Sequence, residues 1–329
     1  MKGRRDGKKA LLEKSLVVYF SEYLLSKGYI SKSETIKSVA EIKNCDLPTY
    51  QIITSYSDLL VKRVDVLQDA QYEVGLLKTE AAFCQLIGNY EYLSRFTPLF
   101  RGYDEGEKIL VYDSIEDGKN FSAIYKSHLI EQEEIQLLTK WLSLLHRLRF
   151  EKKAHGQFDL TNNKIFSGLF KQEIPAAMVE KDAAYSAQLI SLYREINKDE
   201  RVLKRIEALA SSYAQKSETL IHGNFTPLNW FRSDSGVAIA NPSFARFGPP
   251  EFDLGLFVAH LSLAQVPKEK IEIVFDSYEN RDEIDLTIMN HFAALEILYW
   301  QFYGRKQIVS GNLKISKSLI EYAWELLVK

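Results

Sequence analysis

The side chains with the clearest chemical potential gather in residues 219–243. This segment contains His222, Asn224 and Asn229, and Asn241 follows after a predicted hairpin of two short strands. Polar groups at the ends of a hairpin can converge on one binding site, since loops on a rigid scaffold often carry function. Amide side chains can donate hydrogen bonds to a ligand and accept them from it, but they cannot take up a proton at neutral pH.

The spacing of this segment resembles that of the aminoglycoside phosphotransferase and choline kinase group. The chain reads His222-Gly223-Asn224-Phe225-Thr226-Pro227-Leu228-Asn229, then Ile239-Ala240-Asn241, then Asp253-Leu254-Gly255. In that group the pattern is His-Gly-Asp, four residues and Asn, then a hairpin ending in Ile-Asp and a downstream Asp-Leu. The resemblance implies an α+β, protein-kinase-like two-lobed fold, with a small β-rich N-lobe and a larger helical C-lobe.

Two residues nearer the N-terminus extend the resemblance. Members of the group carry a lysine on the third strand, matched by Lys62 in LLVKRV, and a helical glutamate that pairs with it, matched by Glu80 in LLKTEAAF. The resemblance then covers residues 35–329 and implies that Lys62 and Glu80 serve nucleotide binding. Without it, both are ordinary solvent-facing charges of a strand and a helix.

Two asparagines depart from the pattern of the group. In its members the loop aspartate orients the attacking hydroxyl and the hairpin aspartate chelates magnesium, whereas this chain has Asn224 and Asn241 there. General-base assistance contributes about 10²–10⁴-fold to a rate, and an uncharged amide is a poor ligand for a hard divalent cation. Asn224, at the catalytic position, is therefore expected to be inactive. Asn229 and Asn241 remain as nucleotide-binding positions and, at most, weak metal ligands.

The segment that would cover the phosphates also departs from the group. No glycine occurs between Gly28 and Gly75, and IKNCDLPTY stands where a glycine-bearing loop is expected. Backbone amides approach phosphates most closely where no side chain intervenes. Nucleotide binding is therefore expected to be weakened without being excluded. The chain departs from the group at Asn224, at Asn241 and in the glycine-free segment. Three departures favour a natural loss of phosphoryl transfer over a single introduced Asp-to-Asn change.

Structural roles compete with functional ones in this region. Asparagine tolerates turn conformations, so the two loop asparagines also fit as turn formers. His222 is expected to bond backbone groups of its loop. Asn241 is expected to be extended because Pro242 follows it, and Asp253 is expected to cap a helix and brace the loop.

Hydrophobic periodicity predicts a β-rich first third. An amphipathic helix over residues 11–26 ends near Gly28, and it packs either on its own lobe or on a partner. The predicted strands cover residues 38–44, 49–55, 58–65 and an antiparallel pair within 97–115, with one inserted helix over 71–88.

From residue 130 onward helical patterns dominate. The first helix, EEIQLLTKWLSLLHRLR, has Leu137, Trp141, Leu144 and Leu145 as its expected apolar face. Further helices are predicted near residues 180–195, 199–215, 253–264, 268–279, 283–303 and 314–328. We therefore predict an N-terminal extension with an amphipathic helix over residues 1–30, a kinase-like N-lobe over 31–116 and a helical C-lobe over 117–329 containing the catalytic-loop-like hairpin.

Composition excludes several other functions. The 329 residues carry 42 Lys+Arg against 44 Asp+Glu, a net charge of −2, which argues against a nucleic-acid partner. The cysteines, Cys45 and Cys84, are too few for a disulfide framework or a cysteine-rich zinc site and fit a reducing compartment. No apolar run approaches the roughly 18 residues of a membrane span. Glu13 and Lys14 interrupt the first apolar stretch, unlike a signal peptide, so we expect a cytoplasmic protein.

The favoured prediction is a catalytically impaired kinase-like protein, or pseudokinase. It would act as a binding or scaffolding partner, and a peptide or a biosynthetic enzyme is the protein partner suggested by analogy alone. No cofactor is certain, and ATP with Mg²⁺ is the one that the resemblance implies.

The alternative is a divergent but active ATP-dependent phosphotransferase or nucleotidyltransferase acting on a small molecule or a peptide. A carboxylate outside the motif would then hold the metal. Asp104, Asp159 and Glu251 are candidates that spacing does not separate.

Overall fold

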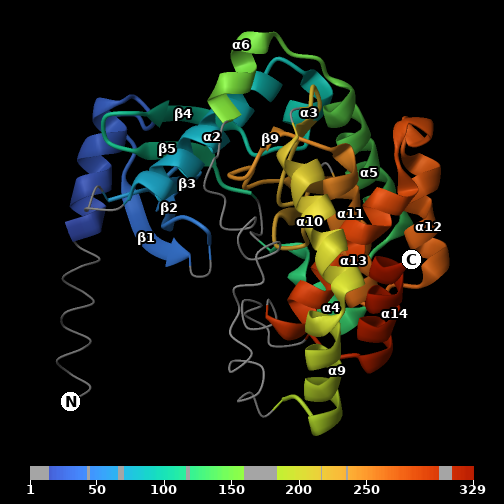
Figure 1. Ribbon diagram of the computed structural model, residues 1–329. Coiled ribbons are helices and arrows are strands. Elements are labelled where there is room, and N and C mark those ends of the chain that lie inside the picture. The colour runs from blue at the N-terminus through green and yellow to red at the C-terminus, as the bar shows by residue number, and fades with distance from the viewer. Residues whose placement is uncertain are drawn as a thin grey trace, which may run out of the picture. The chain divides into compact units, whose positions relative to one another are not determined.

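The computed structural model describes residues 15–42, 45–65, 70–115, 119–158, 184–215, 217–234, 236–303 and 313–329. The chain divides into two compact units, Met1–Gly118 and Lys119–Lys329. The first unit is built on a β-sheet and the second is largely helical (Figure 1). Within the described residues, no helix combines the length and apolarity that a membrane crossing requires.

A five-stranded antiparallel sheet forms the first unit, with the order β1–β2–β3–β5–β4. Its strands are β1 (Ile36–Ile42), β2 (Thr49–Thr54), β3 (Asp58–Arg63), β4 (Phe100–Asp104) and β5 (Ile109–Asp113). The predicted strands lie within a few residues of these bounds. Because side chains alternate along each strand, the sheet has two faces that bury different residues.

A helix over residues 15–26 covers one face of the sheet. Its Phe20, Tyr23 and Leu24 share a core with Leu59 and Val61 of β3, among other strand residues. Burial of each large apolar side chain contributes roughly 1.5–3 kcal/mol, which explains why the helix packs on its own sheet. Of the two predicted placements, packing on its own lobe is the one observed.

The opposite face of the sheet carries α2 (Gln71–Ile87). In the register of the central strands, Leu60 of β3 pairs with Tyr112 of β5, and Lys62 pairs with Leu110. Directly paired residues share a face, so Lys62 and Tyr112 are diagonal neighbours on this face. A short helix that the sequence did not predict, α3 (Glu91–Arg95), follows α2.

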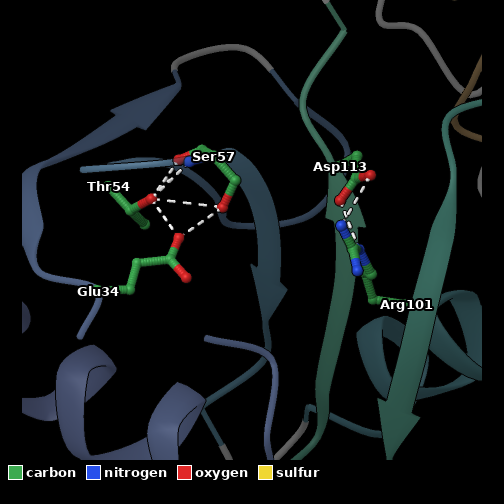
Figure 2. A network of polar contacts seen from close by, with 5 residues as sticks. All are labelled: Glu34, Thr54, Ser57, Arg101 and Asp113. Carbon is green, nitrogen blue, oxygen red and sulfur yellow. Dashed lines mark hydrogen bonds and ion pairs between the residues drawn. The ribbon is translucent and has the colours of Figure 1, made fainter. Parts of the chain in front are cut away.

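A polar network fixes the turn between β2 and β3 (Figure 2). Glu34 accepts hydrogen bonds from the hydroxyls of Thr54 and Ser57 and from the backbone amide of Ser31. Burial opposes its ionisation, and the hydrogen bonds outweigh that effect, so the pKa of Glu34 is lowered. A second pair in the same view, Arg101 and Asp113, joins β4 to β5 through two hydrogen bonds.

The second unit is a helical bundle with short strands inserted into it. Its longer helices are α5 (Gln132–Arg147), α9 (Ala187–Lys198), α10 (Glu200–Ala214), α11 (Pro250–Leu263), α12 (Lys268–Ser277), α13 (Leu286–Phe302) and α14 (Lys317–Val328). Its shorter helices are η1 (Phe121–Ala123), α4 (Ile124–Ser127), α6 (Lys152–His155), η2 (Gly156–Phe158) and η3 (Arg281–Glu283). A Cβ at Gly255 would lie 2.7 Å from the Cβ of Phe292, so glycine permits the close packing of α11 on α13 (Figure 1).

The buried face of α5 differs slightly from the predicted one. Trp141 and Leu145 are fully buried, as expected, whereas Leu137 and Leu144 are only half-buried. Ile135, Leu138 and Leu142 take the central positions instead. Both sets recur at helical spacing, and the packing partners decide which stripe faces inward.

Four short strands carry the chemically interesting segment. They are β6 (Leu220–Ile221), β7 (Trp230–Ser233), β8 (Gly236–Ile239) and β9 (Arg246–Phe247). β7 pairs with β8 around the predicted turn, and β6 pairs with β9. The two residues of β9 are too short a run to show alternation, so the sequence did not predict this strand.

Candidate functional site

The loop between β6 and β7 is anchored in the core by Phe225. Its ring stacks on Trp141 of α5 at 6.0 Å and meets the rings of Trp230 and Phe257 edge-on or tilted. Phe225 and Trp141 are both fully buried. The polar residues on either side of Phe225 are therefore held by a rigid aromatic cluster.

A glycine at the start of the loop is required by geometry. Gly223 has φ +77°, and a Cβ there would lie 2.0 Å from the carbonyl oxygen of Phe244. No other residue fits this close approach without displacing the backbone.

Asp253 braces the loop from α11. Its carboxylate accepts from the backbone amides of His222 at 2.6 Å and Gly223 at 2.9 Å, and from His146 Nε2 at 3.2 Å. His146 Nδ1 in turn accepts from the hydroxyl of Tyr278. Burial, and secondarily Glu251, raises the pKa of Tyr278, so that hydroxyl stays protonated as a donor. The predicted bracing is confirmed, but Asp253 lies within the first turn of α11 and is not its N-cap, which is Pro249.

His222 bonds backbone groups, as the sequence predicted. Its Nε2 donates to the carbonyl of Ala240 at 3.1 Å, and its Nδ1 accepts from the amide of Asn224 at 3.3 Å. The ring is fully buried. It joins the loop to the end of β8.

The three asparagines predicted as site residues are brought together by hydrogen bonds. Asn241 Nδ2 donates to Asn229 Oδ1 at 2.9 Å, and Asn229 Nδ2 donates to the backbone carbonyl of Asn224 at 2.8 Å. Asn229 is 4% exposed, and the other two are half-buried. We call this arrangement the amide chain.

The backbone of Asn241 differs from the expectation. It has φ +60°, in the left-handed region, and is not the extended conformation predicted from the following proline. Asparagine tolerates this region better than most residues. The hydrogen bond to Asn229 holds its side chain in place and outweighs the local preference.

The amide chain does not fit the Mg²⁺ ion that the resemblance implies. Because Asn229 Nδ2 is used by a carbonyl, Asn229 Oδ1 must face Asn241, and Asn241 presents an N–H to it. Mg²⁺ is held by carboxylate and water oxygens, not by N–H groups. Across the described residues, no cluster of three or more His, Cys, Asp or Glu side chains could hold a metal ion.

Two of the three alternative acids are engaged elsewhere. Asp104 pairs with Lys27 at 2.7 Å and accepts from the amide of Gly106. Glu251 accepts from the amide of Asp285 at 3.1 Å. Asp159 lies outside the described residues.

In the N-terminal unit, Lys62 and Glu80 form a buried ion pair. Lys62 Nζ lies 2.5 Å from Glu80 Oε1, and their side chains are 3% and 0% exposed. The pairing expected from the resemblance is present, and Lys62 is not a solvent-facing strand residue. Burial of both charges requires that each keep its partner.

Two neighbours of this pair were not predicted from the sequence. The hydroxyl of Tyr112 donates to Glu80 Oε1 at 2.9 Å, and Cys84 Sγ lies 3.2 Å from that hydroxyl. Tyr112 is separated from Glu80 by 32 residues, so only the strand register could have indicated the contact. Burial raises the pKa of Cys84 to about 12, which keeps the thiol protonated.

Comparison with known proteins finds distant relatives that include methylthioribose kinases. No family model matches the chain. It is 27% identical to the methylthioribose kinase of Bacillus cereus over 193 residues, which are 55% of this chain and 48% of the relative. The corresponding figure for the enzyme of Bacillus mycoides is 25% over the same length. The chain thus spans about half the length of these relatives.

Solved structures of small-molecule kinases match almost the whole chain. The choline kinase LicA of Streptococcus pneumoniae aligns with a TM-score of 0.56 at 15% identity, over 96% of this chain and 98% of that one. A spectinomycin phosphotransferase, solved with ADP and spectinomycin, aligns with a TM-score of 0.56 at 13% identity, over 96% and 93%. The chain therefore has the protein-kinase-like fold of these enzymes, and the predicted fold class is confirmed.

Proposed function

We propose that this chain is a member of the small-molecule kinase group that binds a nucleotide without Mg²⁺ and is impaired in phosphoryl transfer. The observation that carries this proposal is the hydrogen bond from Asn241 Nδ2 to Asn229 Oδ1. It joins directly the two side chains that the resemblance assigns to a metal. The loop residue assigned to orient the attacking hydroxyl, Asn224, has no carboxylate.

The amide chain is a stable alternative to a metal site. With aspartate at position 241, two oxygens would face each other about 2.9 Å apart and would need a cation or a proton between them. With asparagine, the same gap is closed by a hydrogen bond. Asparagine at position 241 therefore lacks the charge that would attract the metal and places an N–H donor on Asn229 Oδ1.

The nucleotide part of the proposal is supported by the relatives. Structures with this fold have been solved with AMP and with ADP. In this chain the Lys62–Glu80 pair is intact, and Lys62 is the cation proposed to contact the phosphates. The relatives support a small molecule as the second ligand, because their names refer to methylthioribose, choline and spectinomycin. The protein or peptide partner expected from the sequence has no counterpart in those names.

A second candidate function is favoured by the comparisons themselves. Each of the named relatives is a kinase or a phosphotransferase, which supports an active ATP-dependent phosphotransferase acting on a small molecule. We rank it second because function is decided by the site rather than by the fold. The site here lacks the loop and hairpin carboxylates.

Calorimetric titration of the full chain with ADP separates the two candidates. The proposal predicts dissociation constants that agree within about threefold in Mg²⁺ and in EDTA, since no metal bridges protein and phosphate. It also predicts no transfer from ATP to small-molecule hydroxyl acceptors. Affinity that rises more than tenfold with Mg²⁺, together with transfer at ordinary enzyme rates, would instead establish the second candidate.

The variant Asn241→Asp tests the carrying observation directly. We expect ADP binding to become dependent on Mg²⁺ by about tenfold, because a carboxylate then faces Asn229 and accepts a cation. Asn89→Asp is the matched control, since Asn89 is exposed and the chemical change is the same. If Asn241→Asp responds to Mg²⁺ no more than Asn89→Asp does, the amide chain is not what excludes the metal.

A further inference from the structure

In the N-terminal unit, the buried Lys62 and a third residue, Tyr112, both donate hydrogen bonds to the same oxygen of the Glu80 carboxylate. Glu80 Oε1 accepts from Lys62 Nζ at 2.5 Å and from the hydroxyl of Tyr112 at 2.9 Å. Lys62 comes from β3 and Tyr112 from β5, so the carboxylate of α2 is joined to two neighbouring strands. Two charge-assisted hydrogen bonds to this oxygen hold its position more tightly than one would.

The sheet register explains why the tyrosine reaches this place. Tyr112 pairs with Leu60 of β3 and with Phe100 of β4, and its ring packs on Phe100 at a centroid distance of 5.7 Å. Lys62 is its diagonal neighbour on the same face, within reach of long side chains. The ring is held by packing, so its hydroxyl is presented at a fixed point above the sheet.

Tyr112 contacts two successive turns of α2. Besides Glu80, its hydroxyl oxygen lies 3.2 Å from Cys84 Sγ, four residues further along the helix. Both Tyr112 and Cys84 stay protonated, because burial raises the pKa of each. The phenol proton is used on the acceptor-only carboxylate, so the thiol donates to the phenol oxygen. Rotation or sliding of α2 would break both hydrogen bonds at once.

We propose that Tyr112 is the positioning residue that holds Glu80, and through it the Lys62 ammonium, in the orientation that meets an anionic ligand. The pair is then in place before any ligand arrives, and no ordering of α2 is needed on binding. The ligand part of this inference rests on the proposed function, in which Lys62 contacts the phosphates of a nucleotide. The positioning part concerns the protein alone.

Acylation of Lys62 by an amine-reactive reagent, quantified by peptide mass spectrometry, tests the positioning part without a ligand. In Tyr112→Phe the ring remains and the hydroxyl is lost. We expect the rate at Lys62 to rise at least fivefold, because Glu80 no longer shields the ammonium in one orientation. Lys78, an exposed residue of the same helix, provides an internal standard whose rate stays unchanged.

The matched control is Cys84→Ala, which removes the neighbouring hydrogen bond but leaves the phenol on Glu80. It should change the rate at Lys62 less than twofold. In titrations with ADP, Tyr112→Phe should weaken binding about tenfold and Cys84→Ala less than threefold. Equal rates at Lys62 in wild type, Tyr112→Phe and Cys84→Ala would overturn the inference.

The two proposals fail in distinguishable ways. A faster reaction at Lys62 in Tyr112→Phe with no ADP binding by the wild type would keep the positioning role and refute the nucleotide. If wild type binds ADP, and Tyr112→Phe changes neither ADP binding nor the reactivity of Lys62, nucleotide binding is kept and the positioning role of Tyr112 is refuted. If Tyr112→Phe does not fold, proton NMR of the wild type decides: a slowly exchanging Tyr112 hydroxyl proton close to the Glu80 side chain is required, and its absence overturns the inference.

Discussion

The two units solve the same problem, a buried polar site, in opposite ways. The N-terminal unit keeps full charges, with Lys62 and Glu80 neutralising each other 2.5 Å apart. The C-terminal loop carries amides at the positions where the resemblance expects charges, and Asn241, Asn229 and the Asn224 carbonyl are joined by two hydrogen bonds.

This difference between the two units affects how much stability is lost when a charged side chain is replaced. Removing one partner of a buried ion pair leaves the other uncompensated, at a cost of about 3–5 kcal/mol. At position 241 the asparagine side chain donates an N–H to an acceptor 2.9 Å away. Stability therefore constrains the charges of the Lys62–Glu80 pair more tightly than it constrains the residue type at position 241.

Among the substitutions considered, replacement of Asp253 in the second unit should lower the free energy of unfolding most. Asp253→Ala removes the acceptor of two buried backbone amides and of His146, each left without its partner. We expect the free energy of unfolding to fall by about 4 kcal/mol. Urea unfolding measures it, with the exposed Asp282→Ala as control. A loss below about 1 kcal/mol would mean that Asp253 does not brace the loop.

Replacing either member of the Lys62–Glu80 pair should lower the free energy of unfolding by a smaller amount, and the two losses should not add in the double variant. Lys62→Met and Glu80→Leu should each cost about 3 kcal/mol, because each removes the ion-pair partner 2.5 Å from a buried charge. The double variant should cost only about 1 kcal/mol, since no charge is left without its counter-charge and the Tyr112 hydroxyl, which loses Glu80 as acceptor, still contacts Cys84. Lys78→Met is the control, because its pair with Glu105 is exposed to solvent and stabilises the fold little. If the losses add in the double variant, the stability of the first unit does not depend on the pairing of Lys62 with Glu80.

Replacement of Glu34 should lower the free energy of unfolding least, and the size of this loss should depend on pH. Its pKa is lowered in the folded chain, so its contribution is present above the usual value of 4.5 and is lost as pH falls through the lowered value. Glu34→Gln should cost about 1 kcal/mol at neutral pH and less at about pH 3. Urea unfolding at both values measures this, with the exposed Glu22→Gln as control. A cost that does not shrink at low pH would assign the effect to packing.

Much of the fold was predictable because its elements repeat at regular periods. The strands β1 to β3, the pair β4–β5 and most of the long helices follow hydrophobic alternation or helical spacing in the sequence, and they lie within a few residues of their predicted bounds. The helix predicted near residues 180–195 is an exception, because α9 begins at Ala187, and residues 180–183 lie outside the described residues. The short elements α3 and β9 were not predicted, because neither run shows a recognisable apolar pattern. The left-handed backbone of Asn241 was missed because a side-chain contact overrides the preference of a residue before proline.

The sequence alone determined which residue types stand at the key positions: a lysine on the third strand, a glutamate on α2 and asparagines at the loop and hairpin ends. It could not decide what those side chains touch. Tertiary structure brought Tyr112 to Glu80 across 32 residues and Asp253 to His222 across 31, because strand register and helix packing set these distances. The amide chain was decided in the same way, since an amide's donor and acceptor acquire their partners only when the hairpin folds against the loop.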